Sequence, residues 1–425
     1  MHIHQKRWYP WLVVYLLWGV ALLNYLDRQM LSTMRPSMMV DIRELESAEN
    51  FGRLMAVFLW IYGLMSPVSG LIADRINRKK LIVGSLGVWS GVTLLMGYAS
   101  TFEQIYILRA IMGVSEALYI PAALALIADY HTGTTRSLAV GIHMTGLYFG
   151  QALGGFGASV ADTWSWQTAF HGFGIAGILY GVLLIVLLKD KRNEVPDHEE
   201  GFSFKNRIWS LRKSLVLLTG TFSFWVILFY FSAPSFPGWA IKNWLPTLYA
   251  DTLGIEMPKA GPLSTITIAI SSFVGVITGG VLADRWITRN LRGRIFTGAI
   301  GLSLTIPALF LLGFGRGFPV IVTGGIAFGI GFGMFDANNM PILCQFVTPR
   351  NRAAGYGILN MAGVFAGALA TSWLGKSAEA GNLGRDLALL SLPVALAVIL
   401  LLITLKPETA DKRQDFLNYS RAKKR

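Results

Sequence analysis

The feature that most constrains this chain is a series of apolar stretches, each around 20 residues long, that recurs from one end to the other. One such stretch, when helical, is long enough to cross the ~30 Å hydrocarbon core of a bilayer. Only 14% of the residues are charged, whereas soluble domains carry about 25%. We therefore expect an all-α membrane protein that crosses the bilayer many times.

Hydropathy and helix-breaking residues together predict twelve transmembrane helices. The first apolar stretch is too long for a signal-peptide core and is expected to be retained. In the seventh span, Pro234, Pro237 and Pro246 should kink or break the helix. The predicted spans cover residues 10–34, 52–74, 80–99, 103–129, 136–161, 168–188, 215–250, 262–284, 294–314, 318–346, 352–376 and 384–405.

The basic residues are distributed by topology. The net charge is +13, but Lys and Arg concentrate in every second connection, which is the positive-inside pattern of a membrane protein and not a nucleic-acid-binding face. Both termini are therefore expected in the cytoplasm, with the chain spanning the plasma (inner) membrane. Cys344 is the only cysteine, which excludes an intramolecular disulfide and a thiolate metal cage. No motif for ATP, another cofactor or a metal is found, so neither an enzyme nor an ATP-driven pump is expected.

The two halves of the chain repeat one another. GLIADRINRKK, which begins at Gly70, and GVLADRWITRNLRGR, which begins at Gly280, both place Asp-Arg after a glycine and three residues. Pro121 and Pro341 fall at matching places in the fourth and tenth spans. Two similar six-helix halves are typical of a transporter that rocks around a substrate held between them. The expected parts are an N-terminal half (1–188), a cytoplasmic linker (189–214), a pseudo-symmetric C-terminal half (215–405) and a basic cytoplasmic tail (406–425).

The chain resembles the major facilitator superfamily over nearly its whole length. GLIADRINRKK is similar to the superfamily signature between the second and third spans, with Asn77 where a second glycine usually stands. The stretches NYLDR, RAIMGVSEA, NWLPTLY and GILNMAG resemble the anion:cation symporter family, which includes sugar-acid and sialate carriers. Spinster-like lipid carriers share several of these stretches. The resemblance implies a carrier that works by alternating access and is complete as a monomer.

Four charged residues lie inside predicted spans of the first half: Asp27 and Arg28 on the first, and Arg109 and Glu116 on the fourth. Charges at membrane depth are costly and normally functional. The Arg28 guanidinium can bind a carboxylate through two hydrogen bonds, and Asp27 can gain or lose a proton. Adjacent helical residues point about 100° apart, so these two should not face each other. The alternative for either pair is a structural ion pair.

Charge counting indicates the mechanism. The four side chains sum to zero when ionised, so a bound monoanion would leave a buried net charge of minus one. A cotransported proton removes that cost. The resemblance agrees, because symporters of this family use the Asp-Arg pair for substrate and protons and the glutamate with its arginine for proton coupling. We therefore expect symport through Glu116, Asp27 and Arg109, with sodium as the alternative coupling ion.

Four uncharged polar residues are further substrate-binding candidates. Tyr25 and Tyr62 match family positions for cavity-lining tyrosines, and Gln151 and Asn360 could bind substrate hydroxyls. The alternative is a hydrogen bond to a neighbouring helix, worth about 0.6 kcal/mol.

Two charged residues of the second half are further candidates. Asp336 corresponds to Glu116 in the repeat, and Lys242 lies near the outer end of the seventh span. Either could add a second charge contact and allow a dianion or a larger substrate. A peripheral position is the alternative.

The loop signature has a different expected task. Asp74, Arg75 and Arg78, with Asp129 at the inner end of the fourth span, are placed to form an ionic cytoplasmic gate. The resemblance implies that this gate holds the outward-open state and breaks in each cycle. The alternative is a purely topological role for these charges.

The expected function is proton-coupled uptake of a small organic anion, most plausibly a sugar acid such as a hexuronate, aldonate or sialate. A spinster-like lysolipid carrier and a drug/proton antiporter are the alternatives, and a non-transporting receptor is a third.

Overall fold

The computed structural model describes residues 8–73, 76–131, 135–190, 217–348 and 351–406. Within these ranges every regular element is a helix. Eleven helical spans are long and apolar enough to cross a membrane, and the segment made by α6 and α7 supplies the twelfth crossing beside α1. The predicted all-α membrane fold is confirmed. The predicted linker and tail lie almost wholly outside the described residues.

The helices of the N-terminal half alternate in direction. They are α1 (Tyr9–Met38), the short η2 (Arg43–Glu46), α2 (Ala48–Ala73), α3 (Arg78–Met96), α4 (Phe102–Ala117) with α5 (Tyr119–Tyr130), α6 (Arg136–Gly154) with α7 (Gly157–Thr163), and α8 (Trp166–Leu187).

The C-terminal half repeats this order. Its helices are α10 (Phe222–Leu253), α11 (Met257–Ile287), α12 (Gly293–Phe314), α13 (Phe318–Asp336) with α14 (Asn339–Phe346), α15 (Arg352–Glu379), and α16 (Leu383–Leu389) with α17 (Ser391–Thr404).

The fourth and tenth spans are each interrupted at the same relative place. Pro121 is the third residue of α5, and Pro341 is the third residue of α14. A proline in the first turn removes no helical hydrogen bond, so it favours the start of a new segment there. Glu116 lies just before the first interruption and Asp336 just before the second.

The seventh span differs from the sequence prediction. α10 runs without a break from Phe222 to Leu253, with Pro234, Pro237 and Pro246 inside it. All three prolines are buried. The packing of α10 against its neighbours therefore outweighs the backbone hydrogen bonds that the prolines remove.

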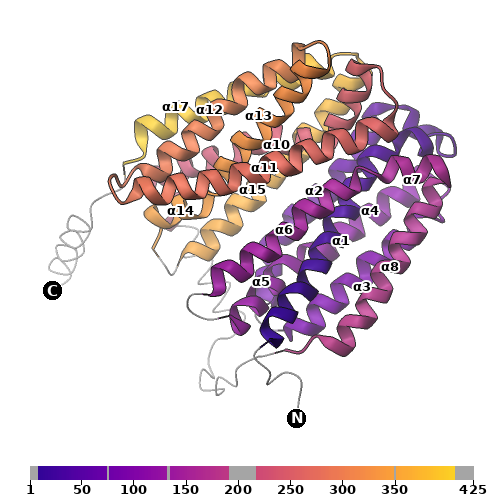
Figure 1. The fold of residues 1–425 in the computed structure, drawn as a ribbon, viewed down its shortest axis with the longest axis horizontal. Helices are drawn as coiled ribbons and strands as arrows, with labels where there is room; N and C mark the ends of the chain where they lie inside the picture. Colours follow the sequence, from indigo (N-terminus) through magenta and orange to yellow (C-terminus); the bar gives the residue numbers. More distant parts are fainter. Residues whose placement is uncertain (1–7, 74–75, 132–134, 191–216, 349–350, 407–425) are drawn as a thin grey trace.

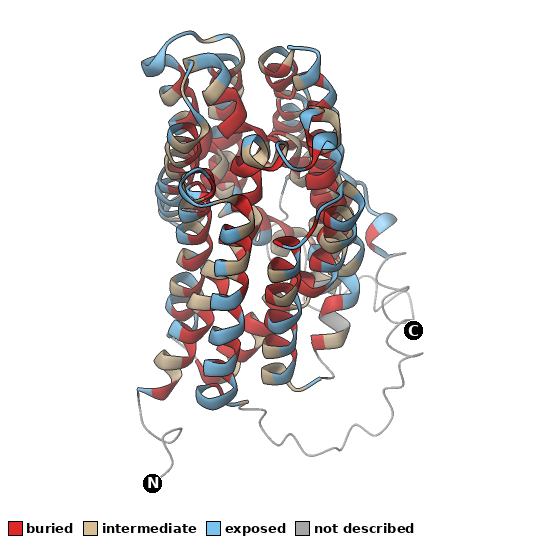
Figure 2. Ribbon diagram, turned by 90° about the vertical axis from the view of Figure 1, so that its right-hand side faces the viewer, coloured by how far each residue is buried: buried red, intermediate tan, exposed pale blue. Residues whose placement is uncertain are grey.

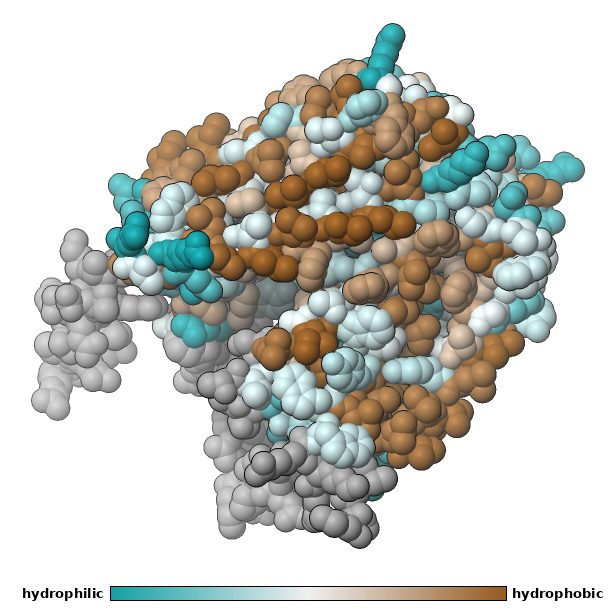
Figure 3. Space-filling view, viewed as in Figure 1, coloured by the Kyte–Doolittle hydropathy of each residue, from teal (hydrophilic) through white to brown (hydrophobic). Residues whose placement is uncertain are grey.

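The two halves form two bundles that lie side by side, the first from indigo to magenta and the second from red-orange to yellow (Figure 1). Across the boundary, α2 packs along α15 and α6 packs against α11. Buried residues line the helix faces that meet, while exposed residues cover the outside (Figure 2). On the face seen in Figure 3, hydrophobic side chains cover much of the middle and the most hydrophilic ones lie toward the ends.

Glycines allow α6 to approach α1 closely. A Cβ atom added to Gly146 would lie 2.7 Å from the Trp18 carbonyl oxygen, and one added to Gly154 would lie 2.8 Å from the Leu26 carbonyl oxygen. Both distances are too short for a side chain. These glycines therefore set the distance between α6 and α1, the helix that carries Asp27 and Arg28.

Several polar contacts join the halves where η2 and the start of α2 meet the end of α15, and where α7 meets the start of α11. Ser159 Oγ donates a hydrogen bond to the Pro258 carbonyl oxygen at 3.0 Å. Ser47 Oγ donates to Glu379 Oε2 at 2.6 Å, and the Glu49 backbone N–H donates to the same oxygen at 2.9 Å. The halves are thus tied together at one end.

Candidate functional site

The centre of the candidate site is an ion pair between α1 and α4. Arg28 Nε donates to Glu116 Oε2, and the two side chains are 8% and 0% exposed. Breaking a buried pair by removing one partner costs about 3–5 kcal/mol, because the other charge is left uncompensated. The structure therefore brings two of the predicted residues together, across two helices.

Aromatic rings surround the Arg28 guanidinium. Its central carbon lies 4.9 Å from the ring centroid of Tyr25, 4.9 Å from that of Phe58 and 4.7 Å from that of Tyr62. Such a cation–π contact stabilises a desolvated cation by about 2 kcal/mol or more. Phe58 was not predicted, although it precedes Tyr62 by four residues and so shares its helical face.

Asp27 points away from Arg28, as its neighbouring position on the helix predicts. Its side chain is 4% exposed, and Oδ2 accepts a hydrogen bond from Thr93 Oγ1 of α3 at 3.2 Å. Thr93 was also missed by the sequence analysis, because one threonine in an apolar span gives no signal. The two predicted acids thus have different partners, Arg28 for Glu116 and Thr93 for Asp27.

Arg109 lies against the same aromatic group without pairing with an acid. Its guanidinium carbon is 4.8 Å from the Phe58 ring centroid, and Nη1 donates to Met112 Sδ at 3.1 Å. It is within range of the Glu116 charge. Among the described residues, however, Glu116 is ion-paired with Arg28 and not with Arg109. The alternative of a structural ion pair between Arg109 and Glu116 is therefore not found among the described residues.

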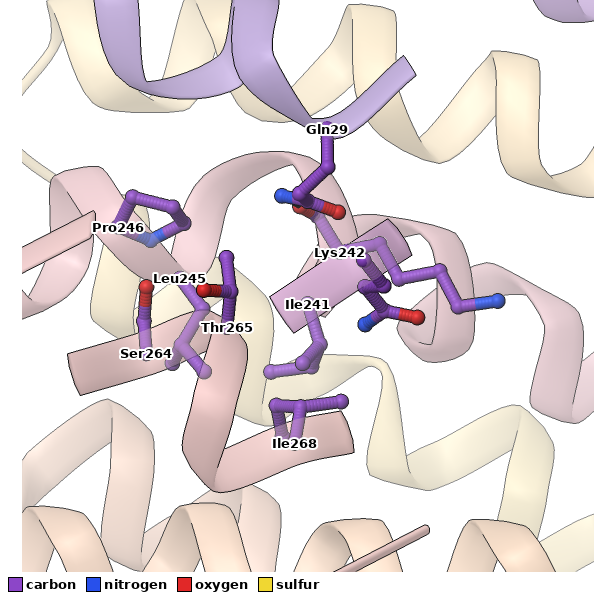
Figure 4. A pocket seen from close by; sticks show the side chains of 9 residues that line it. Gln29, Ile241, Lys242, Leu245, Pro246, Ser264, Thr265 and Ile268 are labelled. Carbon is purple, nitrogen blue, oxygen red and sulfur yellow. Dashed lines mark hydrogen bonds between the residues drawn. The ribbon is translucent and has the colours of Figure 1, made fainter. Parts of the chain in front are cut away.

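The two predicted amide side chains lie between the halves. Asn360 Nδ2 of α15 donates to Ser66 Oγ of α2 at 2.9 Å. Gln151 is 5% exposed and lines a narrow crevice together with residues of α1, α10 and α11 (Figure 4). In this crevice Gln29 Nε2 donates to the Lys242 carbonyl oxygen at 2.7 Å. Both amides are therefore at helix contacts that join the halves.

The family follows from the whole sequence. The model of the Major Facilitator Superfamily matches residues 17–371, which is most of the chain. The chain belongs to the Major Facilitator Superfamily. It is thus a multi-pass membrane transporter.

Two relatives illustrate what the chain is similar to, and the name of the second describes a cargo. Protein spinster homolog 1 of Xenopus laevis is 29% identical over 322 residues, which are 71% of this chain and 59% of the relative. The chain therefore matches less than two thirds of that relative's length. The 4-hydroxybenzoate transporter PcaK of Acinetobacter baylyi is 24% identical over 438 residues, which cover 93% of this chain and 91% of the relative.

A solved structure has the same fold. The crystal structure of a bacterial homologue of the human lysosomal transporter spinster, in an inward-facing and occupied conformation, superposes with a TM-score of 0.76 at 18% identity. The match covers 94% of this chain and 97% of the other. The arrangement of twelve helices in two halves is therefore that of a transporter of this superfamily.

Part of the predicted gate is described. In this transporter Arg78 forms an ion pair with Asp129 and donates from Nη1 to the Ala125 carbonyl oxygen at 3.0 Å. These contacts join α3 to α5 within one half. Asp74 and Arg75 lie outside the described residues.

Proposed function

We propose that this transporter carries a small organic anion together with a proton, and that Arg28 binds the carboxylate of the substrate. The observation that carries the proposal is the buried Arg28–Glu116 pair with its aromatic surround. Glu116 here occupies the face of the guanidinium that a substrate carboxylate would take. A guanidinium suits this exchange because it binds carboxylates in a fixed planar geometry.

The pair provides a route to coupling. When Glu116 gains a proton it loses its charge and its hold on Arg28, and a substrate carboxylate can replace it without changing the net charge of the site. Proton and anion therefore favour each other's binding. Asp27 is the second acid in reach, because its charge interacts with those of Glu116 and Arg109.

Two classes of organic anion are candidates for the substrate. A sugar acid such as a hexuronate, aldonate or sialate would place hydroxyls near Tyr25, Tyr62, Gln151 and Asn360. The rings around Arg28 favour a second candidate, an aromatic or amphiphilic acid, since they would stack on an apolar substrate body. The name of one relative, a 4-hydroxybenzoate transporter, is in keeping with this second class.

The predicted topology identifies the outer and the cytoplasmic side of the proposed transporter. With the basic connections and both termini in the cytoplasm, the ties at Ser47, Ser159 and Glu379 close the outer side. Alternating access would then open that side and close the gate of Asp74, Arg75, Arg78 and Asp129. We propose a monomer in the plasma (inner) membrane that imports its substrate, with the halves 1–188 and 215–405 moving as units.

Uptake into proteoliposomes tests the proposal. Labelled glucuronate, gluconate, sialate and 4-hydroxybenzoate would be offered with and without an inward proton gradient. We expect gradient-stimulated uptake of one acid by the wild type and none by Arg28→Ala. Lysolipid transfer without uptake of any acid, from protein that is folded and inserted, would overturn the proposal.

A further inference from the structure

The repeat places a second charged pair in the C-terminal half. α10 is the counterpart of α1, and Lys242 lies at nearly the same position along α10 as Arg28 does along α1. Asp336 ends α13 directly before the helix interruption, as Glu116 nearly ends α4. Lys242 and Asp336 are thus the structural equivalents of Arg28 and Glu116.

This second pair differs from the first in being open. Asp336 is exposed although it lies deep within the protein. Within the described part of the chain neither residue forms an ion pair. Asp336 Oδ1 accepts a hydrogen bond from Asn339 Nδ2 at 3.3 Å.

The Lys242 side chain is held by rings instead. Its amino nitrogen lies 4.9 Å from the Trp239 ring centroid and 5.9 Å from that of Phe332. Figure 4 shows this amino end extending away from the crevice that its backbone lines. Lys242 is within electrostatic range of Asp336, but the described residues show no ion pair between them.

Asp336 is central to the molecule. Its charge acts on Tyr25 of α1, Tyr148 of α6 and Tyr356 of α15, and it also acts on Lys242. Lys242 in turn is within range of Arg28. The charged residues of the C-terminal half are thus within electrostatic range of Tyr25 and Arg28 in the N-terminal half.

We propose that Lys242 and Asp336 set the net charge of the cargo, so that the site accepts one negative charge and rejects two. This inference rests on the proposed function. The charged side chains of both halves sum to zero only when Lys242 offsets Asp336. Two like charges on the order of 10 Å apart, at an effective dielectric constant of about 20, repel enough to weaken binding roughly tenfold. We expect an effect of that order from an uncompensated Asp336 carboxylate.

The proposal makes opposite predictions for the two residues. Lys242→Gln leaves Asp336 uncompensated, so the KM for a monocarboxylate should rise about tenfold. Asp336→Asn in the same chain restores neutrality and should return the KM to near the wild-type value. Asp336→Asn alone leaves an extra positive charge, so it should allow uptake of a dicarboxylate that the wild type rejects.

The experiment measures uptake of matched probes into proteoliposomes. The probes are glucuronate with glucarate, and 4-hydroxybenzoate with terephthalate, which differ within each pair mainly by one carboxylate. Wild type, Lys242→Gln, Asp336→Asn and the double variant would be compared. Lys259→Gln, an exposed lysine at the start of α11, is the matched control and should behave as wild type.

The outcomes separate this inference from the proposed function. If the wild type takes up none of these probes and none of the acids offered in the test of the proposed function, both are overturned. Monocarboxylate uptake that depends on Arg28, but is not restored in the double variant, overturns only the inference and makes Lys242 a direct substrate ligand. Failure of Asp336→Asn to take up either dicarboxylate also overturns it. Gain of dicarboxylate uptake supports it, and misfolding cannot produce that gain.

Discussion

At the scale of single residues, Arg28 is the centre of the proposed substrate site. It holds Glu116 on one side and three aromatic rings on the others. A permanent cation in that position can be neutralised by the protein's own acid or by a carboxylate from outside, and only one of them fits at a time. In the proposed function, Glu116 and the substrate carboxylate therefore compete for Arg28.

This competition predicts the behaviour of Glu116→Gln. The amide keeps the size of the side chain but cannot exchange a proton, so uptake should no longer respond to an inward proton gradient. Exchange of labelled for unlabelled substrate across the membrane should persist, because Arg28 still binds the carboxylate. Both rates would be measured in proteoliposomes for whichever acid the wild type carries.

The control is Glu103→Gln, an exposed acid in the first turn of the same helix. It should keep the full response to the gradient. If Glu116→Gln also kept the full response, the proton would have to be carried elsewhere, and Asp27 would be the next residue to test.

At the scale of helices, the sequence predicted the spans well and their interruptions less well. Hydropathy identified each crossing, because a lipid-facing helix must be apolar over its full length. The three prolines of α10, Pro234, Pro237 and Pro246, predicted a kink or a break, and the helix runs through all of them without a break. A proline shows which hydrogen bond is lost but not what the neighbouring helices contribute.

The site was predictable where its residues share one helix. The helical periodicity placed Asp27 and Arg28 on different faces, and the resemblance brought Tyr25 and Tyr62 into the site. Periodicity could not predict that Glu116 pairs with Arg28 and not with Arg109, because that choice depends on how α1 and α4 dock. Periodicity could not predict the hydrogen bond from Thr93 to Asp27 either, because it depends on how α1 and α3 dock.

The contact of α1 with α6 gives a prediction at this scale. Gly146→Ala would place a Cβ atom against the Trp18 carbonyl oxygen, and backbone cannot move aside as a side chain can. We expect a loss of about 1–3 kcal/mol in stability and slower uptake, because α1 carries Asp27 and Arg28. Thermal unfolding in detergent and uptake in proteoliposomes would be compared with the wild type.

Gly141→Ala on the same helix is the matched control. No atom lies within 4 Å of its added Cβ, so the higher helix propensity of alanine should leave the stability equal to the wild type or raise it by up to about 1 kcal/mol. Equal effects of the two substitutions would mean that close contact with α1 does not set the stability.

At the scale of the whole molecule, the ties between the halves are concentrated at one end. Toward the other end, Asn360 still donates to Ser66 across the halves, whereas the bonds of Arg78 with Ala125 and of Gln345 with Leu291 stay within a half. A carrier that alternates its access must break the first set of contacts in each cycle. The bond of Ser47 with Glu379 belongs to that set.

Locking that contact should therefore stop transport. Ser47→Cys with Glu379→Cys, in a chain whose native Cys344 is changed to alanine, can be joined by a short bifunctional thiol reagent that a reductant reverses. We expect joining to abolish uptake and the reductant to restore it. A second pair, Glu44→Cys with Asn50→Cys, joins neighbours within one half and should leave uptake unchanged. Full uptake by protein whose Ser47–Glu379 link is complete by mass spectrometry would mean that this end stays closed throughout the cycle, and rocking of the two halves about a central site would have to be abandoned.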